Sequence, residues 1–206
     1  ETLEHFEASL AHFRRLFRIE PRVAVRDRHP GYLSSRVAEE MGLERVLEVQ
    51  HHHAHAAAVL AEHGLEGPAL AVVYDGTGYG DDGRIWGAEL LVSTLTGYRR
   101  VARLRNVPLA GGDAAVRAPW RIALGYRSLE PGLASAFPAA FAGIPERKVR
   151  VVERQIVAGL NAPEASSMGR LFDAAAAVLG VRRRCRYEAE AAMALEALAG
   201  RRPAAS

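Results

Sequence analysis

The sequence predicts an α/β fold, and three observations lead to this prediction. Short apolar runs bounded by turn residues, such as ALAVVYD at 69–75, are typical of buried strands. Segments rich in helix formers, such as AHAAAVLAEH at 54–63, alternate with them, which favours parallel strands. A hydrophobic content of 49% and a charged content of 25% are ordinary for a globular chain, and 206 residues suffice to bury a core.

The chain up to residue 50 contains two predicted helices and two predicted strands. Apolar residues recur at helical spacing in ETLEHFEASLAHFRRLF (1–17), and Pro21 ends this helix. The next strand is RVAVRD (22–27), and a turn at Pro30 leads into a helix that stops near Gly42. RVLEVQ (45–50) has strand character and leads into a histidine-rich segment.

The histidine-rich segment HHHAH (51–55) predicts a metal site. His51 and His55 are four residues apart, so a helix places them on one face with about 5–6 Å between their Cβ atoms. Asp75 ends the strand ALAVVYD, at the sheet edge where ligands of open α/β sheets bind. We therefore expect His51, His55 and Asp75 to bind one divalent ion, Fe(II) or Zn(II). His52 and His53 point to other faces and are expected to be exposed or to lie behind the ligands. A zinc peptidase is rejected, because its motif requires Glu where His52 stands.

The segment GTGYGDDG (76–83) is expected to be a tight turn after that strand. Its glycines allow close approach of a phosphate, and their N–H groups can form an anion site, so phosphate is expected at Gly76, Thr77, Gly78 and Gly80. Without the neighbouring histidines and Asp75, the same pattern would indicate an ordinary connection between two strands. It is not a Walker A loop, because no Gly-Lys-Ser/Thr follows.

After this turn, RIWGAELLVST (84–94) and TGYRRVARLRNV (96–107) predict an antiparallel hairpin. Gly111-Gly112-Asp113 then stands at the start of a helical segment that includes Pro119-Trp120-Arg121; such a Gly-Gly-Asp is either a simple capping turn or part of a site. An amphipathic helix is expected over Ile144–Leu160.

Another helix begins at a Ser166-Ser167 cap and ends at Gly180. Arg170 and Asp173, three residues apart near its start, form an ordinary ion pair on one reading and a nucleotide contact on the other, since helix N-termini favour anions. RYEAEAAMALEALAG (186–200) is the last predicted helix.

These motifs together resemble a known family. QHHHAH followed by DGTGYGDDGRIWGAE is very similar to the C-terminal module of the HypF-type carbamoyltransferases, which mature nickel–iron hydrogenases. The segments GGD…R.PWR.AL, SSMGRLFD and YEAEAA resemble further patterns of that module, with Ala189 in place of the usual Gly. The family pattern near the N-terminus is matched by Asp27, His29, Pro30, Tyr32 and Ser34. The module is similar to the threonylcarbamoyl transferases of tRNA modification, and the resemblance implies their actin/hexokinase-like fold.

The resemblance also implies roles for particular residues. The residues implied to contact the nucleotide are Gly169, Arg170, Asp173 and Glu188, and those implied on the substrate side are Gly111, Gly112, Asp113, Arg117 and Arg121. Residues 1–110 would form an α/β lobe with the histidine helix, and residues 111–206 a mainly helical segment on the nucleotide side.

The activity that the resemblance implies is carbamoyl transfer. The whole enzyme converts carbamoyl phosphate and ATP into carbamoyl-adenylate, and this module passes the carbamoyl group to the C-terminal cysteine of HypE. That group becomes a cyanide ligand of the hydrogenase iron. The sequence contains no acylphosphatase-like region, no CxxC zinc fingers and no adenylate-forming domain. We therefore expect a fragment of a larger enzyme, and a partial fold, that is inactive alone.

Two alternatives remain open. One is a tRNA threonylcarbamoyl transferase-like enzyme, and the other is a non-catalytic basic interaction domain built on Arg182–Arg184 and Arg201-Arg202. A net charge of +3 is too small to favour a nucleic-acid partner. The single cysteine, Cys185, excludes an internal disulfide and fits a reducing compartment, and no apolar run approaches the roughly 20 residues of a membrane helix. A cytoplasmic protein without membrane contact is expected.

Overall fold

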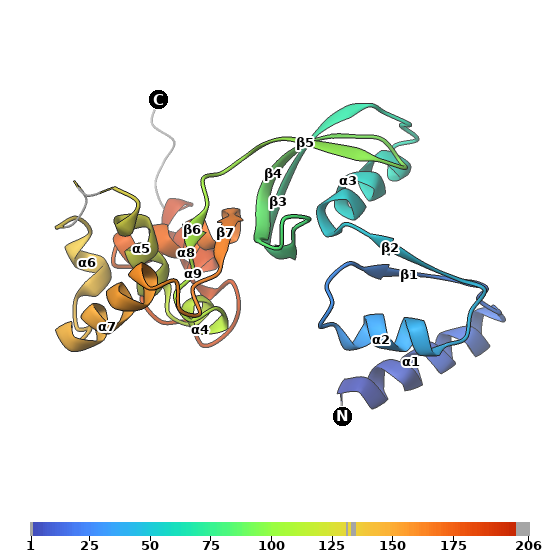
Figure 1. The fold of residues 1–206 in the computed structure, drawn as a ribbon, viewed down its shortest axis with the longest axis horizontal. Coiled ribbons are helices and arrows are strands. Elements are labelled where there is room, and N and C mark those ends of the chain that lie inside the picture. Colours follow the sequence, from blue (N-terminus) through green and yellow to red (C-terminus); the bar gives the residue numbers. More distant parts are fainter. Residues whose placement is uncertain (1, 131, 133–134, 201–206) are drawn as a thin grey trace.

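The computed structural model describes residues 2–130, 132 and 135–200. Its elements form three groups along the molecule (Figure 1). A small N-terminal unit lies at one end, a curled sheet lies in the middle, and a cluster of helices lies at the other end. Arg201-Arg202, which the basic-domain alternative used, lies outside the described residues.

The N-terminal unit consists of α1 (Thr2–Phe17), β1 (Val23–Asp27), α2 (Leu33–Glu40) and β2 (Arg45–Val49). The two strands pair in parallel, from Val23 opposite Arg45 to Asp27 opposite Val49, and form a sheet of their own. The predicted helices and strands of this region are thus confirmed. The register places Asp27 beside the end of β2, where the histidine helix starts.

The histidine helix α3 (His51–Glu62) follows β2 without a loop. Gln50 caps it, because its side-chain oxygen accepts a hydrogen bond from the backbone N–H of His53 at 2.9 Å. The helix packs on the central sheet through Ala56, which joins Val73 and Leu91 in one buried cluster. The first turn of the helix therefore presents polar side chains, and the later turns pack on the sheet.

The central sheet contains β3 (Ala69–Tyr79), β4 (Ile85–Ser93), β5 (Tyr98–Arg103), β6 (Val107–Pro108) and β7 (Glu164–Ser167). The order is β3-β4-β7-β6, and β5 also pairs with β4. The predicted antiparallel hairpin of β4 and β5 is confirmed.

The prediction that a strand ends at Asp75 is wrong. β3 continues to Tyr79, with an irregularity in its pairing with β4 between Tyr74 and Gly78. The tight turn comes later, where Gly80 N donates to Arg84 O at 2.9 Å and Gly83 N donates to Gly80 O at 3.0 Å. Asp75 therefore lies at a β-bulge inside a long strand, and bulges are known to re-aim side chains next to active sites.

The helical cluster contains α4 (Asp113–Val116), α5 (Pro119–Ser128), α6 (Pro138–Phe141), α7 (Glu146–Val157), α8 (Met168–Val178) and α9 (Glu190–Ala199). Pro119 begins α5 and does not lie inside a longer helix, because proline lacks the N–H that a helix interior needs. α5 is the centre of the cluster, with Ile122 buried towards Ala174 of α8 and Trp120 buried against Val152 of α7. No helix in the described ranges is both long and apolar enough to cross a membrane.

Strand β4 changes its partner at Glu89, and this side chain is fully buried. Residues 85–87 of β4 pair in parallel with β7, whereas Glu89 and the residues after it pair antiparallel with β5. The Glu89 carboxylate accepts hydrogen bonds from Arg100 Nε of β5 at 2.6 Å and from Ser166 Oγ of β7 at 2.5 Å. It therefore joins the two strands that share one edge of β4.

We predict that Glu89→Ala lowers the free energy of unfolding by about 1.5–3 kcal/mol, because it removes the buried carboxylate that Arg100 and Ser166 both contact and leaves Asp82 as the remaining carboxylate beside Arg100. Urea denaturation followed by circular dichroism measures the change. The control is Glu130→Ala, which removes an exposed ion pair with Arg105 and is expected to cost less than about 1 kcal/mol. Equal costs for the two variants would contradict the role of Glu89.

Candidate functional site

Two helices begin against the same part of β3. α3 brings its first turn to Gly78, and α8 brings its first turn to Gly76. The bulge in β3 holds Asp75 between these two contacts. The site is therefore made by three elements that are far apart in the sequence, and Asp75 is the residue that they share.

His51, His55 and Asp75 lie together, as the spacing predicted. One ligand atom from each residue can be chosen so that all three lie within 4.8 Å of one another. His55 Nε2 lies 3.3 Å from His51 Nε2, and His51 Nε2 lies 3.1 Å from Asp75 Oδ2. The side chains of His51 and Asp75 are 27% and 24% exposed, so the cluster can be reached from solvent.

The His55–His51 and His51–Asp75 distances match those between neighbouring ligands of a single metal ion. A tetrahedral ion with ligand bonds of about 2.0 Å holds neighbouring donor atoms about 3.3 Å apart. His51 Nδ1 lies 2.7 Å from Asp27 Oδ2, and a carboxylate can only accept, so the proton of a neutral His51 belongs on Nδ1. Its Nε2 then turns a lone pair towards the carboxylate of Asp75. The lone pairs of His51 Nε2 and the Asp75 carboxylate therefore face one another with no proton between them. A bound cation would remove this repulsion. That these residues bind a metal stays a prediction.

Buried polar groups support the ligands from behind. Asp27 orients His51, as carboxylates commonly do for metal-binding histidines. Behind Asp75, His52 Nε2 lies 3.6 Å from Asp75 Oδ2, and His52 Nδ1 lies 3.2 Å from Gln50 Nε2. Gln50 Nε2 also donates to Tyr79 O at 3.0 Å, which fixes the amide. Because Gln50 Nε2 donates to His52 Nδ1, the proton of a neutral His52 lies on Nε2, where it faces Asp75.

His52 and His53 are both buried, so the alternative that they are exposed is wrong. His52 is fully buried, and this burial lowers its pKa to about 4, although the nearby Asp75 carboxylate opposes the shift. His52 is thus neutral at pH 7. His53 Nε2 lies 3.0 Å from Thr94 O and its ring stacks on Tyr98, which is a structural role away from the cluster.

The other side of Asp75 offers groups for an anion. Arg170 is buried at 4% exposure in the first turn of α8, and its Nε and Nη1 have no hydrogen-bond partner among the described residues. A Cβ added to Gly76 would lie 3.6 Å from Arg170 Nη2 and 3.8 Å from Glu188 Oε1, so these three residues meet. A buried guanidinium at the start of a helix favours an anion, so anion binding next to His51, His55 and Asp75 stays a prediction.

Asp173 lies behind Arg170, with its Oδ2 3.1 Å from Arg170 Nε. Burial raises the pKa of Asp173 to about 6, while Arg170 opposes the shift and Glu188 adds to it. The pair is 5% and 3% exposed, so it is no surface ion pair. The ion pair between Arg170 and Asp173 is thus confirmed, although it is buried, and the nucleotide contact stays a prediction.

The glycines of β3 allow close packing. A Cβ at Gly78 would lie within 2.7 Å of the His51 ring and would overlap His52, and a Cβ at Gly80 would overlap the indole of Trp86. Glycine is therefore needed at these two positions because side chains of α3 and β4 pack against them. Gly76 faces Arg170, and Thr77 is exposed; phosphate binding by residues 76–80 stays a prediction.

The substrate-side residues do not join this cluster. Arg117 and Arg121 line a pocket between α4, α5 and α7, and Gly111 lies under Arg121. Gly112 is the residue before α4 and has a left-handed φ of 53°, while Asp113 is the exposed first residue of that helix. Gly111–Asp113 thus form a turn at the start of α4, and their role on the substrate side stays a prediction.

Comparisons with known proteins decide the family. A family model described as the HypF Kae1-like domain matches residues 1–62, and one described as the second subdomain of the carbamoyltransferase Kae1-like domain matches residues 71–206. The chain belongs to the HypF carbamoyltransferase family. It is 44% identical over 204 residues to carbamoyltransferase HypF2 of Cupriavidus necator, with 96% of this chain and 24% of the relative covered. It is also 44% identical over 207 residues to carbamoyltransferase HypF of Rhodobacter capsulatus, with 96% and 27% covered.

Solved structures agree with this family. The structure described as full-length HypF in the phosphate- and nucleotide-bound form superposes with a TM-score of 0.88 at 40% identity, and 95% of this chain and 25% of that chain are covered. HypF of T. kodakarensis superposes with a TM-score of 0.84 at 34% identity, with 98% and 28% covered. The predicted α/β, actin/hexokinase-like fold is thereby confirmed. The chain spans about a quarter of the length of these HypF proteins.

Sequence reasoning missed the residues that orient the ligands. Asp27 was recognised only as part of a family pattern, and Gln50 only as the residue before the histidines. A parallel pairing of β1 with β2 would have revealed Asp27, because Asp27 lies opposite Val49, two residues before His51. No local signal marks the role of Gln50, which depends on its contact with Tyr79 of β3.

We predict that His51→Ala combined with His55→Ala abolishes stoichiometric metal binding, because two of three ligands are lost. Elemental analysis after reconstitution with Zn(II) or Fe(II) and gel filtration measures the content. His63→Ala is the matched control, since His63 is an exposed histidine at the end of the same helix. Equal metal content in the double variant and the control would rule out this site.

We also predict that Asp27→Asn weakens Zn(II) affinity by about 10–100-fold without unfolding the chain, because His51 loses the carboxylate that fixes its tautomer. Competition with a chromophoric chelator measures the dissociation constant. Asp113→Asn, at an exposed carboxylate of α4, should leave it unchanged. An unchanged affinity in Asp27→Asn would show that Asp27 does not support the site.

Proposed function

We propose that this chain forms the carbamoyl-transfer site of a HypF-type carbamoyltransferase. The donor is carbamoyl-adenylate, made from carbamoyl phosphate and ATP, and the acceptor is the C-terminal cysteine thiolate of a HypE-like protein. The product serves assembly of the cyanide ligands of nickel–iron hydrogenase. Family membership supports a carbamoyltransferase in general, and the donor and acceptor are part of this proposal.

The observation that carries the proposal is the adjacency of two kinds of group across Asp75 and Gly76. On one side, nitrogen and oxygen lone pairs of His51 and Asp75 converge at 3.1 Å. On the other side, Arg170 presents a buried guanidinium beside Gly76. An acyl-adenylate has a polar carbonyl next to a phosphate, so it carries one group for each of these two sides.

The donor set of the metal cluster fits a borderline ion such as Fe(II) or Zn(II). His51, His55 and Asp75 would hold it, with Asp27 and His52 orienting two of them. When bound, such an ion supplies Lewis-acid polarisation to a carbamoyl or phosphate oxygen. The buried position of His52 and Gln50 keeps the ligand side chains in place before any ligand arrives.

The remaining residues bind and orient the nucleotide part. Arg170 and the first N–H groups of α8 favour the phosphate, and Ser167 ties this helix start to β3 by donating its Oγ–H to Asp75 O at 3.2 Å and to Gly76 O at 2.5 Å. Glu188 lies beside Gly76 with an acceptor for a hydroxyl of the ligand. Cys185 is not the carbamoyl acceptor in this proposal, because burial raises the pKa of its thiol and suppresses the reactive thiolate.

A chimera tests the proposal. The segment of Cupriavidus necator HypF2 that aligns with this chain is replaced by this chain, and the chimera is incubated with carbamoyl phosphate, ATP and the HypE-like acceptor. We expect a carbamoylated C-terminal cysteine by mass spectrometry. His51→Ala with His55→Ala in the chimera should slow the reaction at least about 100-fold, the equivalent of roughly 3 kcal/mol of lost charge stabilisation.

Two controls make the outcome decisive. His63→Ala in the chimera should retain the rate, because His63 lies outside the cluster. This chain by itself, given the same substrates, should produce no carbamoylated acceptor, since it spans about a quarter of the length of the HypF proteins that it matches. A folded chimera that stays active without His51 and His55 would overturn the assignment of the site.

A further inference from the structure

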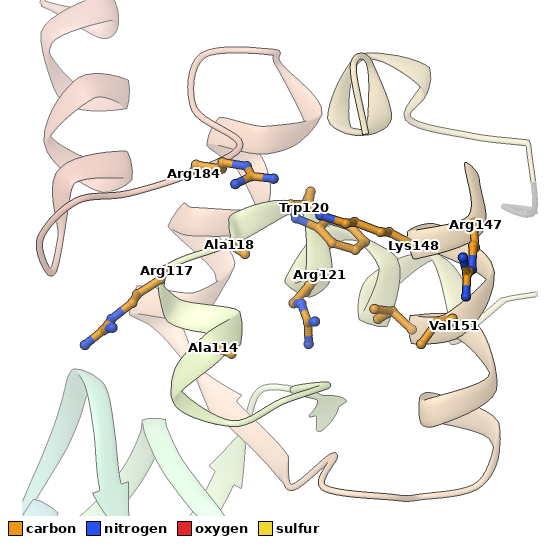
Figure 2. Close-up of a pocket in the computed structure, with 10 residues that line it drawn as sticks. Ala114, Arg117, Ala118, Trp120, Arg121, Arg147, Lys148, Val151 and Arg184 are labelled. Carbon is orange, nitrogen blue, oxygen red and sulfur yellow. The ribbon is translucent and has the colours of Figure 1, made fainter. Parts of the chain in front are cut away.

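A second concave site lies in the helical cluster and has a strongly basic lining. It has a volume of about 550 Å³, within the size range of small-molecule sites. Its walls come from α4, α5 and α7 and from the segment between α8 and α9 (Figure 2). The lining includes Arg117, Trp120, Arg121, Arg147, Lys148 and Arg184. We call it the basic pocket; it shares no residue with the metal cluster.

Five cations line the basic pocket, and no carboxylate of the described residues does. None of the five is in an ion pair within the part of the chain that the structure describes. The two carboxylates of α7 are engaged elsewhere, because Glu146 pairs with Arg150 and Glu153 pairs with Arg127. Arg147 and Lys148 of the same helix are therefore left to the pocket. Like charges that gather without counter-charges repel one another, and an anionic ligand removes this cost.

The floor of the basic pocket is rigid. Trp120 and Val152 are 4% and 2% exposed and belong to one packed cluster. Arg121 is held in place because its Nη1 donates to Ala110 O at 2.8 Å and its guanidinium lies 5.5 Å from the Trp120 ring. A side chain at residue 111 would overlap that guanidinium, and Gly111 has a left-handed φ of 98°, so glycine is required there.

The rim of the basic pocket is also tied together. Cys185 N donates to Arg117 O at 3.0 Å, which fixes the segment that carries Arg184 to the end of α4. Figure 2 shows Arg121, Lys148 and Arg184 grouped around Trp120, with Arg117 and Arg147 farther out on opposite sides. Four of the five cations are arginines, whose planar forks match phosphate and carboxylate oxygens.

We propose that the basic pocket binds a small, multiply charged phosphate compound. Five cations exceed what one carboxylate can neutralise, and the pocket is a cavity for a small molecule and not an extended groove for a peptide or a nucleic acid. The inference stands on the pocket alone and does not depend on the proposed carbamoyl transfer. It gives Arg117 and Arg121 a binding role away from the metal cluster.

Inorganic pyrophosphate is the probe, titrated into the chain by isothermal calorimetry at about 0.15 M salt. We expect saturable binding of one pyrophosphate per chain that weakens as salt rises. Arg147→Ala with Lys148→Ala should weaken it at least tenfold. Arg154→Ala with Arg99→Ala is the matched control, because it removes two exposed cations outside the pocket, one of them on the same helix, and should change affinity less than twofold.

Three outcomes would overturn the proposal. One is the absence of saturable binding, and another is equal loss in the two double variants, which would mean a non-specific effect of net charge. The third is tighter binding of a glutamate-rich peptide of matched charge, which would make the pocket a contact for an acidic protein segment. Pyrophosphate bound beside Arg170 instead would leave both double variants unaffected, so failure here is separable from failure of the carbamoyl-transfer proposal.

Discussion

The approach of two helix N-termini to one strand is the constraint on which the site depends. α3 and α8 both start against β3, and each contact is possible only because glycine stands there. Gly169 of α8 lies so near to β3 that a Cβ on it would be 2.9 Å from the Cα of Gly76. Gly78 plays the same part for the rings of His51 and His52. Any larger side chain at these positions would push a helix, with its functional groups, away from the strand.

This arrangement places Asp75 in contact with both helices. Its carboxylate faces His51 and His52, while its backbone carbonyl accepts from Ser167 at the start of α8. The predicted metal ligand Asp75 and Gly76, which lies beside Arg170, are therefore adjacent on the same strand. A shift in either helix would move Asp75, so the geometry of both halves is set together. The bulge matters for the same reason, since it interrupts the regular pairing of β3 at this residue.

The sequence predicted that His51, His55 and Asp75 lie together, but it did not predict the groups that surround them. The spacing of His51 and His55 on a helix is a local property, so it was readable from the residues. The strand end at Asp75 was misplaced, because a bulge followed by more extended chain has the same glycine-rich composition as a turn. Asp27 and Gln50 act through contacts between strands and helices that no local pattern contains. The basic pocket was invisible for the same reason, since it joins Arg117 to Arg184.

Ala189 shows how one departure from a family pattern can be understood physically. The usual residue there is glycine, and the structure explains the preference, since residue 189 precedes α9 with a left-handed φ of 64°. Alanine adopts that conformation at a cost that glycine avoids. The fold keeps the conformation because it places Glu188 beside Gly76 and lets α9 pack on α8 through the buried Ala191.

The two sites differ in how far they are organised before a ligand binds. At the metal cluster the supporting groups His52 and Gln50 are buried and hydrogen-bonded, so little side-chain freedom remains to be lost. In the basic pocket only Arg121 is held by a hydrogen bond and a ring contact, while Arg147 and Lys148 are exposed on long stems. Ordering such side chains costs about 0.5–1.5 kcal/mol each. A ligand with a single charge gains too little to offset that cost, which is why the basic pocket selects for several charges in one small molecule.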